Sequence, residues 1–150
     1  MKKRILSMIL LILPVLTIGV ESMPNSIQVW WREGLELPVC EYISFFGTLS
    51  DGSRPMGMAI TGMATGVIFG FMVAYSISKK PKWLSAAKWS AAVAMVMASL
   101  PVIVQSEPMI LPSALVYFML IVQWILSMFL EKEEKKQEKL PQGKRIKNKR

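Results

Sequence analysis

Side chains that could carry out catalysis are scarce in this sequence. It contains no histidine and a single cysteine, Cys40. A Ser-His-Asp site is therefore excluded, and no histidine cluster can hold a catalytic metal. Lys88 lies near Ser85 and Ser90 in the sequence, but we expect its amine to extend toward lipid headgroups instead of activating a serine. These residue types predict a protein that is not an enzyme and that holds no metal or organic cofactor.

Cys40 and the 12 methionines suggest two further chemistries. A lone cysteine forms no intramolecular disulfide, which leaves an intermolecular disulfide or a buried thiol. Pairs such as Met56 and Met58 could suggest copper binding, but residues two apart on a helix point in different directions. Because no histidine or second cysteine completes a set of soft ligands, we interpret the methionines as apolar filling.

The most regular pattern is a series of small residues at every fourth position. This glycine stripe consists of Gly62, Gly66, Gly70, Ala74 and Ser78. Residues four apart lie near one another on a helix surface, and small residues let the backbone of another membrane helix approach closely. A second series of small residues follows along the chain at Ala86, Ser90, Ala94 and Ala98.

Three kinds of partner could cover the glycine stripe. The economical hypothesis is antiparallel packing within the chain, in which Gly62, Gly66, Gly70 and Ala74 face Ser90, Ala94 and Ala98, because consecutive helices joined by a short loop usually pack together. The stripe could instead mediate self-association, which would make the chain a homo-oligomer or a pore. It could also receive a helix of a different membrane protein.

Long apolar runs position these residues. Hydrophobic residues make up 53% of the 150 residues, and the mean hydropathy is +0.41 despite a strongly charged end. Runs of about 20 apolar residues match the thickness of a bilayer core. We predict an all-α integral membrane protein with a membrane domain over residues 1–130 and a charged tail over residues 131–150. The predicted spans are residues 5–20, 56–77, 86–104 and 109–130.

The first of these spans has a second interpretation. Residues 5–20 are the shortest run, contain Pro14 and follow Lys2, Lys3 and Arg4, all of which are compatible with a secretory signal peptide. Because no strong Ala-x-Ala cleavage pattern follows, we favour a retained helix and a bundle of four. Cleavage after about 20 residues would leave three helices.

Basic residues predict the orientation. They occur before the first span, between the second and third spans and in the tail, whereas the segment over residues 21–55 is acidic. By the positive-inside rule, both termini are cytoplasmic and residues 21–55 are external. We therefore place the protein in a bacterial cytoplasmic membrane.

The external segment is rich in aromatic residues, which either rest at the outer headgroup boundary or contact another protein. Its aromatic side chains are Trp30, Trp31, Tyr42, Phe45 and Phe46. Gln123, a long polar side chain within the last span, could bond to a partner helix, to its own bundle or to interfacial water.

The tail changes character along its length. Glu131 and Lys135 are spaced for a solvated continuation of the last helix, which Pro141 and Gly143 then end. Basic residues beyond that point are expected to contact anionic lipid headgroups. They are Lys144, Arg145, Lys147, Lys149 and Arg150. No aromatic residue accompanies them, so we expect no nucleic-acid partner.

The predicted spans contain no Asp, Glu or Arg, and their single lysine, Lys88, lies at an entrance. Proton-coupled transport normally needs ionisable groups at membrane depth. We therefore expect a non-enzymatic accessory or immunity-type protein that contacts another membrane protein. A holin-like pore is the alternative, and a small-solute transporter is a more distant third hypothesis. In topology alone, the chain is similar to four-span bacteriocin immunity proteins, accessory subunits of secretion or conjugation machines and, with three spans, phage holins.

Overall fold

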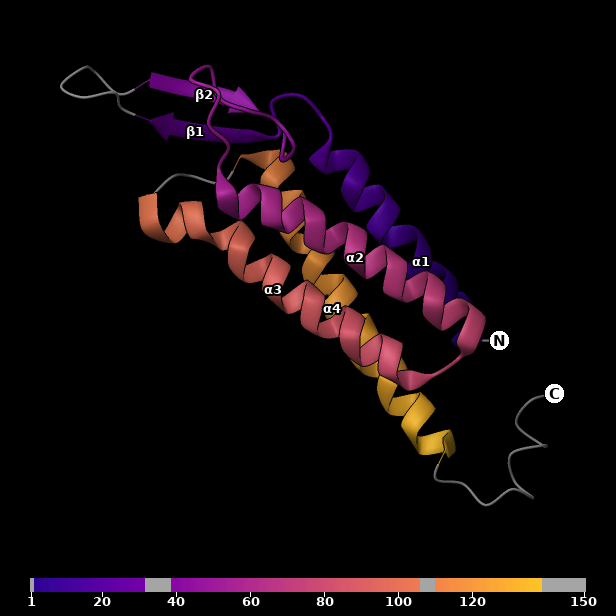
Figure 1. The fold of residues 1–150 in the computed structure, drawn as a ribbon. Coiled ribbons are helices and arrows are strands. Elements are labelled where there is room, and N and C mark those ends of the chain that lie inside the picture. Colours follow the sequence, from indigo (N-terminus) through magenta and orange to yellow (C-terminus); the bar gives the residue numbers. More distant parts are fainter. Residues whose placement is uncertain (1, 32–38, 106–109, 139–150) are drawn as a thin grey trace.

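A computed structural model describes residues 2–31, 39–105 and 110–138. Within these ranges, four helices and one hairpin follow one another along the chain (Figure 1). The helices are α1 (Lys2–Glu21), α2 (Met56–Ser78), α3 (Pro81–Gln105) and α4 (Leu111–Glu138). The strands are β1 (Ile27–Trp31) and β2 (Val39–Ile43).

Each of the four helices is long and apolar enough to cross a membrane. The candidate spans are Lys3–Glu21, Met56–Ser78, Pro81–Leu100 and Leu111–Lys136. The predicted helical, multi-pass architecture is confirmed to this extent. The first span differs from the prediction in one residue that matters for chemistry, because α1 continues through Glu21 instead of ending at residue 20.

The helices close a ring in which each packs against two others. α2 contacts α3, α3 contacts α4, α4 contacts α1, and α1 contacts α2. The turn between α2 and α3 is tight because Lys79 adopts a left-handed conformation with φ 53°, and its N–H donates to Tyr75 O at 2.8 Å. Pro81, whose fixed φ suits the first turn of a helix, then begins α3.

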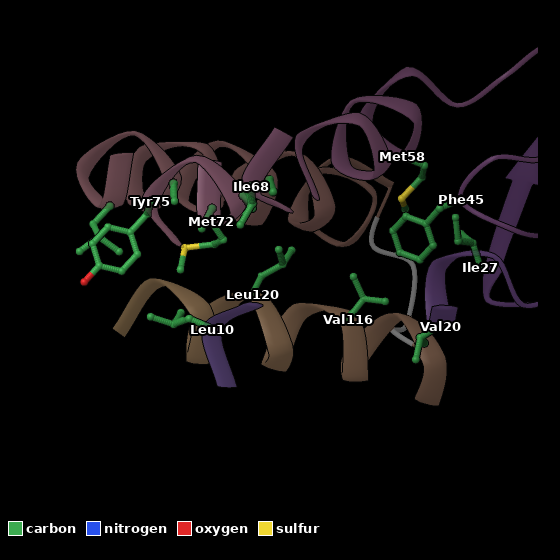
Figure 2. Close-up of a cluster of buried hydrophobic side chains, with 14 of the residues drawn as sticks. Leu10, Val20, Ile27, Phe45, Met58, Ile68, Met72, Tyr75, Val116 and Leu120 are labelled. Atoms are coloured by element: carbon green, nitrogen blue, oxygen red, sulfur yellow. The ribbon is translucent and has the colours of Figure 1, made fainter. Parts of the chain in front are cut away.

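The apolar core runs along the inside of this ring (Figure 2). Met58, Ile68 and Met72 of α2 face Val116 and Leu120 of α4 across it. At one end of the bundle, Val20, Ile27 and Phe45 gather beneath the hairpin. Phe45 is 1% exposed, so the prediction that it contacts a partner or rests on lipid is wrong. Its ring instead joins the hairpin to the bundle.

The two strands have no counterpart among the elements predicted from the sequence. β1 and β2 pair antiparallel, with Ile27 opposite Ile43 and Trp30 opposite Cys40. Their register places Ile27 and Val29, both buried, on the face toward the bundle, whereas Trp30 and Tyr42 are exposed on the other face. The hairpin projects beyond the helices, and the N-terminus lies at the opposite end of the bundle (Figure 1). We name these two ends the hairpin end and the tail end.

Residues 44–55 connect the hairpin to α2 and contain a tight turn over residues 49–53. Gly52 has φ 80°, a conformation that glycine adopts without strain. The Asp51 carboxyl accepts hydrogen bonds from the Ser53 side chain and from the Ser53 N–H, the latter to Oδ1 at 2.8 Å. These hydrogen bonds hold the pKa of the Asp51 carboxyl below its ordinary value. Asp51 and Gly52 thus form the turn that leads toward α2.

Candidate functional site

The glycine stripe of α2 divides into a covered part and an uncovered part. Gly62 is buried, and a Cβ added there would collide with the ring of Phe46. Gly66 and Gly70 are exposed, and a Cβ added at either would meet nothing within 4 Å. The close approach at Gly62 is thus made by an aromatic side chain from the hairpin end, and no described residue covers Gly66 or Gly70.

Helix geometry explains why the stripe turns away from the bundle. An α-helix has about 3.6 residues per turn, so a strict four-residue step rotates by about 40° each time. The face that α2 buries follows alternating steps of three and four residues instead, through Thr61, Thr65, Ile68, Met72 and Tyr75. A stripe that begins buried at Gly62 has therefore left the interior by Gly66.

The expected seam between the two series of small residues does not form at Gly66 and Gly70. α3 does bury Ala94 and Ala98, while Ser90 is half-buried. α3 packs along α2 through other residues. Near the hairpin end, Thr61 Oγ1 lies 3.5 Å from the carbonyl oxygen of Ala94, and a Cβ on Gly57 would lie 3.1 Å from that of Met97. Near the tail end, the ring centroids of Phe71 and Trp83 lie 5.9 Å apart. Ala74, further along the stripe, is half-buried.

A buried carboxyl group lies between α1 and α2. Glu21 is fully buried, and its Oε1 accepts a hydrogen bond of 2.8 Å from the Thr65 hydroxyl. Its backbone carbonyl accepts from the N–H of Phe45 at 3.0 Å, which holds the end of α1 against the hairpin. The other carboxyl oxygen, Oε2, is buried and has no hydrogen-bond partner among the described residues. Glu21 lies one residue beyond the predicted span of residues 5–20, and α1 carries its side chain into the bundle.

A second buried polar pair joins α1 to α4. Gln123 Nε2 donates to Thr17 Oγ1 at 2.9 Å, and the Thr17 hydroxyl lies 2.9 Å from the carbonyl oxygen of Leu13. Gln123 is 1% exposed, and its Oε1 is buried without a hydrogen-bond partner. Its side chain is thus directed into its own bundle, the second of the three alternatives, and is not presented to another protein.

The tail end holds a cluster of ion pairs instead. Glu131, 5% exposed, pairs with Lys88 at 2.8 Å and with Lys135 at 2.6 Å. Glu134 pairs with Lys3 at 2.8 Å and accepts a 2.5 Å hydrogen bond from the Tyr75 hydroxyl. We name this group the tail-end cluster. It contains residues of all four helices, and it gives Lys88 a carboxylate partner in place of the expected lipid headgroups.

The remaining predicted contact residues are dispersed. Trp30 and Tyr42 are exposed, and half-buried Cys40 lies beside them on the same face of the hairpin. Phe46 is 38% exposed while its ring covers Gly62. The Trp31 side chain and the five basic residues at positions 144–150 lie outside what the structure describes.

Spacing in the sequence could have indicated the buried polar groups. Thr17 and Glu21 are four apart at the end of an apolar run, as are Thr61 and Thr65 in the next. Four-residue spacing places each pair on one helix face. A polar residue on each of two helix faces in lipid is a reason to expect that the faces meet.

Comparison of the chain with models of known protein families, with curated proteins and with solved structures yields no match. Any function assigned to it therefore depends on the geometry alone.

Proposed function

We propose that this protein is a non-enzymatic membrane protein that binds a transmembrane helix of a different membrane protein through the exposed side of α2. The observation that supports it is the position of Gly66 and Gly70, which face away from the bundle with open space around them. We name this side of α2, with Met63 and Val67, the outward glycine face.

The energetic argument starts from the intrinsic preference of glycine. Glycine inside a helix is less favourable than alanine by about 1 kcal/mol, unless a close contact compensates for it. Gly62 has such a contact within the chain, whereas Gly66 and Gly70 have none. Another membrane helix could approach the backbone there and regain this free energy through van der Waals contact.

The neighbouring side chains suit such an approach. Met63 is 65% exposed and Val67 is 47% exposed, and both lie one turn or less from Gly66. With the two glycines they form an apolar surface that is low at Gly66 and Gly70 and rises along one side. A complementary helix would place its own side chains over Gly66 and Gly70 and contact Met63 and Val67 at one margin.

Location and orientation form part of the same proposal. Lys79, Lys80 and Lys82 lie at the tail end, whereas Glu41 and Asp51 lie at the hairpin end. The positive-inside rule then directs the tail end to the cytoplasm of a bacterium and the hairpin to the outside. Trp30 and Tyr42 would contact headgroups or an external part of the partner, and the polybasic tail would contact anionic lipid.

Four glycines of this chain provide a matched test. Gly66→Leu and Gly70→Leu fill the outward glycine face, Gly19→Leu changes another exposed helical glycine with open surroundings, and Gly62→Leu disrupts internal packing. After crosslinking in native membranes, we expect the first two variants to fold normally and lose the captured partner. Gly19→Leu should retain it, and Gly62→Leu should lower the folded yield. Partner capture that survives in both Gly66→Leu and Gly70→Leu contradicts the proposal.

The same face could bind a second copy of this chain, which is the pore-forming alternative. The purified protein distinguishes the two, because self-association needs no other component. Under the proposal, the wild-type protein alone is monomeric in mild detergent and does not make vesicles leak. Large homo-oligomers that cause leakage, and that Gly66→Leu dissociates, would instead establish the alternative.

A further inference from the structure

The interior near the hairpin end contains a carboxyl group to which no described residue gives a counter-charge. Among the residues that the structure describes, the ion pairs join Lys3, Lys88 and Lys135 to glutamates of the tail-end cluster. Glu21 takes part in none of them, although its side chain is fully buried. The other charged residues described at this end, Glu41, Asp51 and Arg54, are half-buried or exposed, and the first two bond to Ser50 and Ser53.

Two buried oxygen atoms in this part of the bundle can each accept a further interaction. Glu21 Oε2 and Gln123 Oε1 are the buried side-chain atoms that have no hydrogen-bond partner within the described ranges. Both are acceptors, so neither can satisfy the other while Glu21 is ionised. The two residues are connected through α1. Gln123 donates to Thr17, and Thr17 precedes Glu21 by a single turn on the same face of α1.

We infer that Glu21, Thr65, Thr17 and Gln123 frame an internal binding site for one monovalent positive charge, supplied as a proton or as Na⁺. The four side chains offer a carboxylate, two hydroxyls and an amide oxygen. Hard cations prefer such all-oxygen surroundings. A proton on Glu21 would neutralise the carboxyl group and turn it into a donor. Na⁺ would be coordinated by the carboxylate and by neighbouring side-chain oxygens.

The single carboxylate favours a ligand with one positive charge. One carboxylate neutralises one positive charge, whereas a divalent ion would leave an excess charge in the apolar interior, which is unfavourable. No group of three or more His, Cys, Asp or Glu residues in the described part of the chain could hold a metal ion, so a transition metal has no site here.

This site is independent of the outward glycine face. Thr65 is buried in the bundle, whereas Gly66 and Gly70 are exposed. The inferred site connects α1 to α2 and α4, and its occupation should stabilise those contacts, because a ligand that binds only the folded state favours folding. A variant that loses charge binding and retains partner capture would leave the proposed function untouched.

The test measures unfolding of the purified full-length protein in detergent. One titration replaces choline chloride with NaCl at constant ionic strength and alkaline pH, and the other lowers the pH without Na⁺. We expect stabilisation in at least one of them. A proton site changes the folding equilibrium constant by at most tenfold per pH unit, with stability falling as the pH rises. A Na⁺ site gives a saturable increase with concentration.

Glu21→Gln should abolish the response, since the amide keeps the shape and the acceptor for Thr65 but removes the charge. Glu133→Gln changes an exposed glutamate at the tail end and should leave the response intact. Thr65→Val, which removes the hydroxyl that donates to Glu21, should shift the midpoint of whichever titration responds and thus provides a second test if Glu21→Gln does not fold.

Infrared spectroscopy separates the two sources of charge. A carbonyl band of a protonated carboxyl group that Glu21→Gln removes would identify the proton. A Na⁺-dependent shift of the carboxylate bands that the same variant removes would identify the ion. If the wild-type protein responds to neither titration, or if Glu21→Gln responds as the wild-type protein does, the inference is wrong.

Discussion

The two ends of this bundle bury glutamates in opposite ways. At the tail end, Glu131 is 5% exposed and has two lysine partners. Near the hairpin end, Glu21 is 0% exposed and has one hydroxyl partner. A buried charge is tolerated when it is paired. The charges of the tail-end cluster are therefore paired within the chain, and the cluster can act as a structural connection, whereas no described residue gives Glu21 a counter-charge.

Removing α1 is expected to have the largest effect on folding, because α1 contributes residues to both ends of the bundle. It supplies Glu21 and Thr17 near the hairpin end and Lys3 at the tail end. A chain that begins at residue 23 should fail to give folded protein, since Gln123 and Glu134 would lose partners and the core would lose a helix. Yield and monodispersity in detergent measure this outcome.

The same contacts predict that α1 is retained in the mature protein. Mass spectrometry of the intact protein purified from membranes should therefore include residues 2–21. A mass that lacks them, together with a well-folded remainder, would support the signal-peptide interpretation and remove the comparison between the two ends.

Removing one charge from the tail-end cluster is predicted to destabilise the protein more than changing a buried polar group near the hairpin end. Glu131→Gln leaves Lys88, whose side chain is 21% exposed, without its carboxylate, and should lower the free energy of unfolding by about 2 kcal/mol. Glu133→Gln, on the exposed side of the same helix, is the control and should change it by less than about 0.5 kcal/mol. Equal effects would show that the ion pairs contribute little.

The hydrogen bond between Gln123 and Thr17 should contribute less to stability than the ion pairs of the tail-end cluster. Gln123→Leu removes the hydrogen bond to Thr17 but also removes a buried acceptor that has no partner. Because hydrogen bonds between membrane helices contribute about 0.6 kcal/mol on average, we expect a loss of less than about 1 kcal/mol in reversible unfolding. A loss larger than that of Glu131→Gln would reverse the ranking of the two ends.

The smallest change in stability is expected for Glu21→Gln in the absence of Na⁺ at alkaline pH. The amide oxygen can still accept from Thr65, and an ionised carboxylate no longer has to be buried. We expect the variant to be at least as stable as the wild-type protein under that condition, as unfolding in detergent would show. Marked destabilisation would mean that Glu21 has a counter-charge within the chain.

Much of the architecture could be predicted because lipid imposes a simple rule on sequence. A helix that crosses a bilayer needs about 20 apolar residues, and the runs that satisfy this rule correspond to α1, α2, α3 and α4 within a few residues at most ends. The strands were missed because each is five residues long. Their β-branched and aromatic residues, with Gly34 and Pro38 between them in the sequence, were nevertheless a usable signal.

The candidate sites were less predictable, because a list of small or polar residues does not contain the rotation of a helix. Gly62 and Gly66 are equivalent in the sequence pattern, yet one lies under Phe46 and the other faces outward. Phe45 and Phe46 are adjacent, yet the first is in the core and the second is partly exposed. Such differences depend on how neighbouring elements pack.

By itself, the sequence determined that the chain contains four apolar helices, that its charges are unevenly distributed and that catalytic histidine chemistry is excluded. These properties follow from composition and local length. Only the tertiary structure decided that Glu21 is inside the bundle, that Gln123 bonds to Thr17 and that Gly66 and Gly70 face away from it. The physical reason is that each depends on which helices meet and at what rotation, and that arrangement minimises the free energy of the whole bundle.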